Sequence, residues 1–153
     1  VRSSAWIYLF NLATSPNQLE LASSKFSQFV ESGRQFRDKH TIAFVRRCTE
    51  LRCPQLALTV FSNRPAYRMD LTFTAARLLL YAIHKDYPLS DSVILASLFP
   101  LYNLPKLSSD PISFALFMSA CVREAKVSGS QPAWTIATTL LSPFEELLSQ
   151  TPP

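Results

Sequence analysis

Glycine is almost missing from this chain. Only Gly33 and Gly129 occur among 153 residues, whereas an average usage of about 7% would give about ten. Hairpin turns and β-bulges depend on glycine, and phosphate-cradling loops need it so that the backbone can approach the ligand closely. The shortage therefore argues against a sheet-rich fold and against a glycine-rich nucleotide loop.

Cysteine is also scarce and unpaired in its spacing. Cys48, Cys53 and Cys121 are odd in number and form no CxxC motif, which favours a reducing compartment over a secreted disulfide framework. Cys48 and Cys53 are five positions apart with no second Cys/His pair after them, a poor pattern for zinc. We expect no metal site and no cofactor, and we expect Cys121 to be a small core residue.

Catalytic motifs are missing as well. Neither His40 nor His84 is accompanied by a recognisable nucleophile, so the combination that nucleophilic catalysis requires is lacking. Glu145 and Glu146 are adjacent, and neighbours on a helix point about 100° apart, which favours a solvated helix surface over an acid pair. We predict structural or solvated roles for these residues, no enzymatic activity and no small-molecule substrate.

No apolar run approaches the roughly 18–20 residues that span a bilayer; the longest candidates, 5–12 and 78–83, are far shorter. We expect no transmembrane segment. The chain opens at Val1 rather than methionine, so we expect a processed or partial product whose targeting peptide lies outside it.

Charge is sparse relative to apolar content. Charged residues make up 17% and hydrophobic residues 48%, with a net charge of +4 and a pI near 9.2; about 25% charged is usual. This balance indicates more apolar surface than one core can bury, so we expect part of it to be covered by partner proteins. A well-buried monomer is the alternative. The mild basicity favours an anionic partner.

Eleven prolines supply the punctuation that glycine does not. Proline fits the first position of a helix, where its missing N–H costs nothing. The prolines that precede helical apolar patterns are Pro16, Pro54, Pro111 and Pro132. Asp70 and Ser90 are expected as N-caps, and both glycines as left-handed residues after helix ends.

These signals predict an all-α chain. The expected helices cover residues 3–13, 16–32, 38–51, 54–63, 71–85, 91–102, 111–126 and 132–150. Pro100 and Pro143 fall inside two of them and predict a kink or an early end. Short helices with short loops indicate one domain, 1–153, built as an α-α solenoid of about four antiparallel hairpins, roughly 3–33, 38–63, 70–103 and 110–150.

A weak internal similarity supports repetition. An aliphatic residue, a small residue and phenylalanine recur at 42–44, 71–73 and 112–114, near the start of each later hairpin. In stacked hairpins, the small residue lets helices approach and the aromatic ring fills the space between layers.

The stretch 53–83 carries a resemblance to known repeats. Residues 55–61 (QLALTVF) look like the second helix of a pentatricopeptide or tetratricopeptide repeat, and residues 70–76 (DLTFTAA) look like the opening helix of the next. The resemblance covers roughly residues 41–141, although repeat lengths drift and the usual loop glycines are absent. This irregularity argues against a one-base-per-repeat RNA code.

Degenerate repeats of this kind resemble those of fungal mitochondrial ribosomal (small-subunit) proteins. The resemblance implies a non-catalytic structural subunit in the mitochondrial matrix, within a hetero-oligomeric assembly. Its partners would be ribosomal RNA and neighbouring ribosomal proteins.

Basic residues cluster between positions 34 and 52 and recur one expected hairpin later. Guanidinium groups grip phosphates bidentately, and a row of exposed loops would form a basic ridge that adds affinity without sequence specificity. The residues predicted to contact RNA are Arg34, Arg37, Lys39, Arg46, Arg47, Arg52, Arg64 and Arg68. A solubilising surface, or arginines paired with acidic neighbours, is the alternative.

Aromatic residues crowd the first expected helix. Trp6, Tyr8 and Phe10 combine large apolar bodies with, in two cases, a polar tip that suits interfaces. We predict a protein interface there, with core packing as the alternative. A protein-only scaffold that binds a peptide or helix in its groove is the second functional hypothesis.

Overall fold

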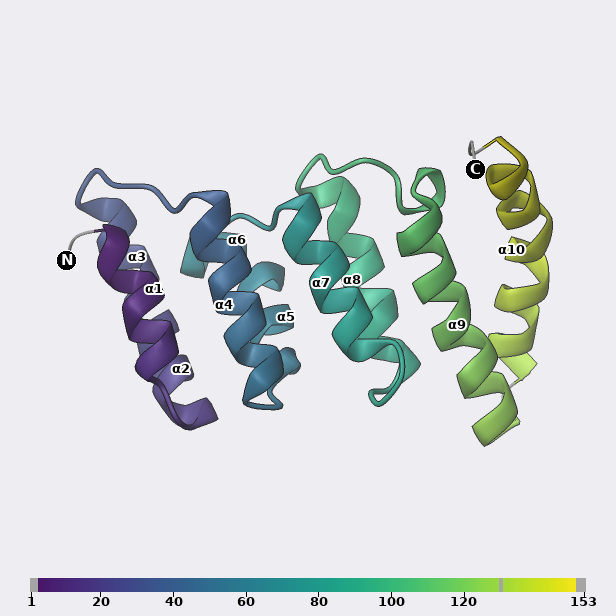
Figure 1. Cartoon of the computed structure of the whole chain (residues 1–153), viewed down its shortest axis with the longest axis horizontal. Helices are drawn as coiled ribbons and strands as arrows, with labels where there is room; N and C mark the ends of the chain where they lie inside the picture. Colours follow the sequence, from purple (N-terminus) through teal and green to yellow (C-terminus); the bar gives the residue numbers. More distant parts are fainter. Residues whose placement is uncertain (1–2, 130, 151–153) are drawn as a thin grey trace. The chain divides into compact units, whose positions relative to one another are not determined.

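The computed structural model describes residues 3–129 and 131–150, and every regular element within those ranges is a helix (Figure 1). The all-helical class is therefore confirmed. Val1, on which the expectation of a processed start rests, lies outside the described residues. The chain divides into two compact units, residues 1–79 and 80–153, which are described separately.

The first unit consists of short helices. They are α1 (Ser3–Leu12), α2 (Pro16–Ser23), α3 (Phe26–Glu31), α4 (Asp38–Glu50), α5 (Pro54–Ser62), α6 (Arg64–Tyr67) and the start of α7 (Phe73–Ile83). Two of their starts follow the predicted signals. The Ser15 hydroxyl accepts a hydrogen bond from the Gln18 N–H (3.4 Å) ahead of α2, and Pro54 occupies the first turn of α5.

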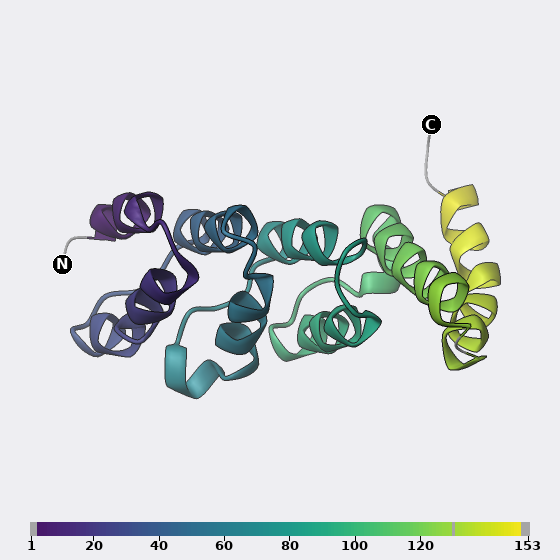
Figure 2. The ribbon, with the colours of Figure 1, turned by 90° about the horizontal axis from the view of Figure 1, so that it is seen from below.

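Within the first unit the helices form two layers. One layer holds α1 beside α4; the other holds α2 and α3 beside α5 and α6 (Figure 2). Across the layers α1 contacts α2, and α4 contacts α5. Contacts within each layer and between the layers thus join α1 to α6 into one unit.

An aromatic core joins the two layers of the first unit. The rings of Phe10 on α1, Phe26 on α3 and Phe44 on α4 are fully buried. The Phe44 ring lies 5.4 Å from Phe10 and 5.3 Å from Phe26, centroid to centroid. Tilted and edge-on pairs at this spacing add to the apolar burial of each ring.

The second unit holds the end of α7, α8 (Leu89–Leu101), the 3₁₀ turn η1 (Leu107–Ser109), α9 (Pro111–Ser128) and α10 (Gln131–Gln150). Asp110 caps α9, since its carboxylate accepts from the Ser113 N–H at 3.0 Å. Gly129, with φ of 65°, closes that helix in the left-handed conformation. The chain then reverses into α10, which packs along α9 (Figure 1).

The helix predicted over 16–32 is divided in the structure. It ends at Ser23 as α2 and resumes at Phe26 as α3. The hydroxyls of Ser23 and Ser24 donate to the carbonyls of Glu20 (2.7 Å) and Leu21 (2.5 Å), and such local bonds compete with the helical ladder. A single 17-residue helix was therefore a wrong prediction.

Two predicted N-caps are also wrong. The Asp70 carboxylate binds Arg64 rather than capping α7, which begins at Phe73. The Thr72 hydroxyl takes that position instead and accepts from the Ala75 N–H at 3.4 Å. Ser90 lies inside α8, because that helix begins at Leu89, two residues before the predicted start at 91.

The two internal prolines lie at different places in their helices. α8 continues through Pro100 and ends at Leu101, one residue before the predicted end at 102. α10 continues through Pro143 to Gln150, so no early end occurs there. Proline leaves the carbonyl four residues earlier without its helical partner. That carbonyl belongs to Thr139, which is exposed, so water can replace the lost bond.

Candidate nucleic-acid interface

A bidentate ion pair holds the turn between α6 and α7. Arg64 donates from Nε to Asp70 Oδ1 (2.9 Å) and from Nη2 to Asp70 Oδ2 (3.2 Å). Both side chains are exposed. The predicted phosphate contact at Arg64 therefore competes with an internal carboxylate, in line with the paired-arginine alternative.

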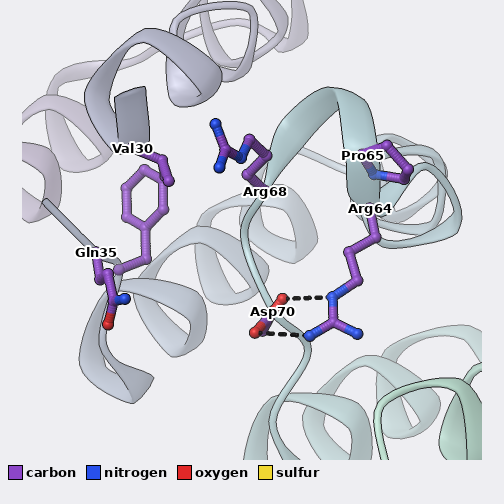
Figure 3. Close-up of a pocket in the computed structure, with 7 residues that line it drawn as sticks. Val30, Gln35, Arg64, Pro65, Arg68 and Asp70 are labelled. Carbon is purple, nitrogen blue, oxygen red and sulfur yellow. Dashed lines mark hydrogen bonds and ion pairs between the residues drawn. The ribbon is translucent and has the colours of Figure 1, made fainter. Parts of the chain in front are cut away.

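A depression of about 420 Å³ lies beside this ion pair (Figure 3). It is bounded by the end of α3, by the loop that leads into α4, and by α6 with the turn after it. Its lining residues are Val30, Gln35, Phe36, Arg64, Pro65, Arg68 and Asp70. Two of the loops predicted to carry basic side chains therefore face one hollow.

The walls of this depression are held in place from behind. The Phe36 ring contacts the rings of Phe26 (4.9 Å) and Phe29 (4.8 Å). The Asp70 carbonyl accepts from the Thr41 hydroxyl on α4 at 3.2 Å. Asp70 also stands between two buried neighbours, Met69 and Leu71. The hollow is consequently formed before any ligand arrives.

Arg68 closes α6 in the left-handed conformation, with φ of 60°, and its N–H donates to the Arg64 carbonyl at 2.8 Å. This conformation costs a residue with a Cβ roughly 1–2 kcal/mol. Across residues 3–129 and 131–150, its exposed guanidinium makes no hydrogen bond or ion pair. An unengaged cation thus borders the hollow.

Arg34, Arg37 and Lys39 are exposed on the loop before α4 and on its first turn. The backbone N–H of Arg37 donates to Nδ1 of His40 at 2.9 Å, and the His40 ring is fully buried. His40 is a structural residue at the helix start, as predicted. With Arg64 and Arg68, these three residues form what we call the basic end of the first unit.

The remaining predicted RNA contacts lie elsewhere. Arg46, Arg47 and Arg52 are at the far end of α4; at 1.5 Å per residue, Arg47 is roughly 14 Å along the helix from Asp38. Arg47 is largely buried, since Nε and Nη2 donate to the Ala13 carbonyl (3.1 and 2.5 Å) and Nη1 binds Glu50 (2.7 Å). The eight residues predicted to contact RNA thus do not all lie at one end of α4, and the Arg47 side chain is held by internal partners.

The predicted aromatic interface is reduced to one side chain. Trp6 and Phe10 are buried in the core of the first unit, whereas Tyr8 is 68% exposed. On a helix, residues 6 and 10 share a face one turn apart, and residue 8 points away from it. Core packing accounts for Trp6 and Phe10, and only Tyr8 is available to a partner.

Sequence reasoning overlooked the relation between Cys48 and Cys53. The Cys53 N–H donates to the Cys48 carbonyl at 2.8 Å across the left-handed residue Arg52, and the two thiols interact. Burial, and then the neighbouring Cys53, raises the pKa of Cys48 far above its usual range. Burial also raises the pKa of Cys53 and of Cys121. A five-residue spacing across a helix end was the available signal.

The other residues considered for catalysis lie near a helix end or on a helix surface. His84 Nδ1 lies 2.5 Å from the Tyr81 carbonyl near the end of α7, and Glu145 and Glu146 are exposed on α10. Among residues 3–129 and 131–150, no group of three metal-ligating side chains gathers. Within the same ranges, no helix combines the length and hydropathy needed to cross a membrane.

Comparison with known proteins finds no protein-family model, no curated protein and no solved structure that matches this chain.

Proposed function

We propose that this chain is a non-catalytic RNA-contacting subunit of a ribonucleoprotein assembly, with the basic end of the first unit as its RNA surface. The observation that carries the proposal is that Arg68 borders a depression which is also lined by Gln35 and Phe36, on the loop that carries exposed Arg34 and Arg37. Exposed Lys39 follows on the first turn of α4. Cations positioned on rigid loops bind phosphate without first being ordered.

The local charge balance supports an anionic partner. Asp70 is engaged by Arg64, so the acidic residues left nearby are Asp38 and Glu31. Asp38 lies in the first turn of α4, where a carboxylate complements the helix dipole. The basic end therefore retains a net positive charge that a nucleic-acid backbone would neutralise.

For the whole chain we propose an α-α solenoid of about four hairpins, as in the pentatricopeptide and tetratricopeptide class. The contacts of α1 with α2 and of α4 with α5 in the first unit, and the α9–α10 pair in the second, support this arrangement. On the same resemblance, the assembly would be the mitochondrial ribosome, in the matrix, with ribosomal RNA and ribosomal proteins as neighbours.

A triple charge reversal tests the RNA surface. Arg34→Glu, Arg37→Glu and Lys39→Glu are all exposed changes, and glutamate is well tolerated at a helix start. The matched control is Lys85→Glu, Lys106→Glu and Lys126→Glu, which alters net charge equally at exposed positions of the second unit. We expect only the first triple to lose co-sedimentation with RNA in a gradient, with helicity unchanged in both.

Salt and nuclease supply the second readout. Binding through phosphates should weaken steeply as salt rises, because counterions are released on association, and nuclease should dissolve the complex. Equal retention of RNA by both triple variants would contradict the proposal.

A second candidate, the protein-only scaffold, has one observation in its favour. An apolar hollow of about 380 Å³ lies between α1 and α2, and Leu9, Leu12 and Leu21 along it are exposed. Exposed aliphatic side chains in a groove suit an amphipathic helix or peptide. A complex that survives both nuclease and high salt would favour this alternative.

A further inference from the structure

The depression at the basic end has two chemically different walls. Val30, Phe36 and Pro65 present apolar side chains, while Arg68 and the Arg64–Asp70 pair present charge. In Figure 3 the Arg64 side chain turns toward Asp70, whereas Arg68 reaches to the side where Val30 lies. A ligand that fills this hollow needs a flat apolar part and an anionic part.

The volume narrows the class of ligand. About 420 Å³ lies within the range of preformed small-molecule sites and is far too small for a duplex. Single-stranded RNA displays unstacked bases that can be splayed into pockets against aromatic side chains while the phosphates remain outside. One nucleotide unit combines the flat and anionic parts in a single residue of a polymer.

The backbone at Arg68 provides an independent observation. A left-handed residue after a helix is usually glycine, and strained positions of this kind cluster at functional sites. Here an arginine occupies the position, and its guanidinium makes no hydrogen bond or ion pair in the described part of the chain. The next residue, Met69, is fully buried and anchors the backbone there. The left-handed turn and the anchor behind it hold the backbone that carries this cation at the rim of the hollow.

We propose that this depression binds one extruded nucleotide of single-stranded RNA, with the base against Phe36 and the phosphate on Arg68. The inference rests on the proposed RNA-binding function and deepens it. It assigns to the first unit a base-dependent contact besides the phosphate contacts of Arg34, Arg37 and Lys39. Arg64 keeps its ion pair with Asp70, and the pair forms a fixed wall of the depression.

The test uses the full chain and two probes of equal length and charge. One is a fluorescein-labelled uridine octamer, and the other is a ribose-phosphate octamer without bases. Base stacking contributes about 1–3 kcal/mol, so we expect the octamer with bases to bind about 5- to 150-fold more tightly in fluorescence anisotropy.

Arg68→Gly is the decisive variant, because glycine relieves the left-handed strain and the fold is retained. In this proposal the contact between Arg68 and the phosphate is what seats the base of the same nucleotide against Phe36. We therefore expect Arg68→Gly to lower the affinity for the uridine octamer to nearly that for the base-free probe. Lys39→Gln is the control: it removes one cation at the same end, should weaken both probes alike and should preserve their ratio.

The outcomes separate this inference from the function on which it rests. Equal binding of the two probes, or a base preference that survives Arg68→Gly, would overturn the nucleotide pocket and leave phosphate-mediated RNA binding intact. Binding of neither probe would overturn both. A 4-thiouridine crosslink to residues 35–36 or 65–68, lost in Arg68→Gly, would place the base in the pocket directly.

Discussion

Arg47 and Ala13 are joined by two hydrogen bonds from one guanidinium to one backbone carbonyl, at 3.1 and 2.5 Å. The carbonyl stands just after the end of α1, where helical partners run out. A third nitrogen of the same group binds Glu50. One side chain of α4 thereby closes the end of a neighbouring helix.

Replacing Arg47 by alanine should therefore destabilise the fold. We expect Arg47→Ala to lower the free energy of unfolding by about 1–3 kcal/mol, because a partly buried carbonyl loses its charged donor. Arg46→Ala, at an exposed neighbouring position, should change it by less than about 0.5 kcal/mol. Urea unfolding followed by circular dichroism measures both, and equal effects would contradict a structural role for Arg47.

Two buried serines of the second unit should respond in opposite directions. In the described part of the chain the Ser92 hydroxyl has no hydrogen-bond partner, whereas the Ser113 hydroxyl donates to Asp110 at 2.5 Å. Ser92→Ala should raise the free energy of unfolding by about 1 kcal/mol, and Ser113→Ala should lower it by about 1.5–3 kcal/mol. Thermal unfolding of the pair checks this; losses of equal size would refute the difference.

The cysteines should differ in reactivity toward iodoacetamide. Raised pKa values keep the thiols protonated near neutral pH, and only the thiolate reacts. Cys53 is half-buried, while Cys48 and Cys121 are buried. We expect Cys53 to be labelled first, with the rate rising about tenfold per pH unit, and the other two only after unfolding in urea. Mass spectrometry of the labelled peptides measures the rate at each cysteine. Labelling of Cys48 in the folded chain as fast as Cys53 would contradict this prediction.

Titration of the same thiols predicts a loss of stability in alkali. Unfolded thiols ionise near about pH 8.5, whereas burial raises the pKa of Cys48 in the folded chain. Above that pH the unfolded state has released a proton that the folded state retains, so stability falls as pH rises. Cys48→Ala should reduce this slope in urea titrations; an unchanged slope would assign the loss to other groups.

Phe26 should contribute far more to the stability of the fold than Tyr8. The Phe26 ring is fully buried and lies 5.2 Å from Trp6 and 5.3 Å from Phe44. Phe26→Ala should cost about 3–5 kcal/mol of stability, while Tyr8→Ala should cost less than about 0.5 kcal/mol. If Tyr8 lies at a protein contact, its loss should instead appear as weaker assembly in pull-downs at unchanged stability.

Helix existence was predictable because its signals are local. Pro16 and Asp110 mark starts through backbone chemistry that no distant residue alters, and Gly129 marks an end in the same way. The recurring phenylalanines also indicated core positions, since Phe44 and Phe114 are buried, although Phe73 is only half-buried.

The predictions that failed concern side chains that could bind either of two partners. Asp70 has the side chain of an N-cap, yet an arginine six residues earlier offers it two charged donors instead. The sequence predicts an exposed cation at Arg47, whereas its guanidinium donates to the carbonyl of Ala13, 34 positions away. Contacts between residues so distant in sequence depend on packing, and one sequence alone does not reveal them.

The breaks in the second layer of the first unit have a mechanical consequence. α2 gives way to α3 after Ser23, and α5 gives way to α6 after Ser62, while α2 packs on α5 and α3 on α6. Two uninterrupted helices, α1 and α4, thus pack against a layer of interrupted helices. Amide protons beside the breaks can exchange with solvent through local opening, without unfolding the aromatic core.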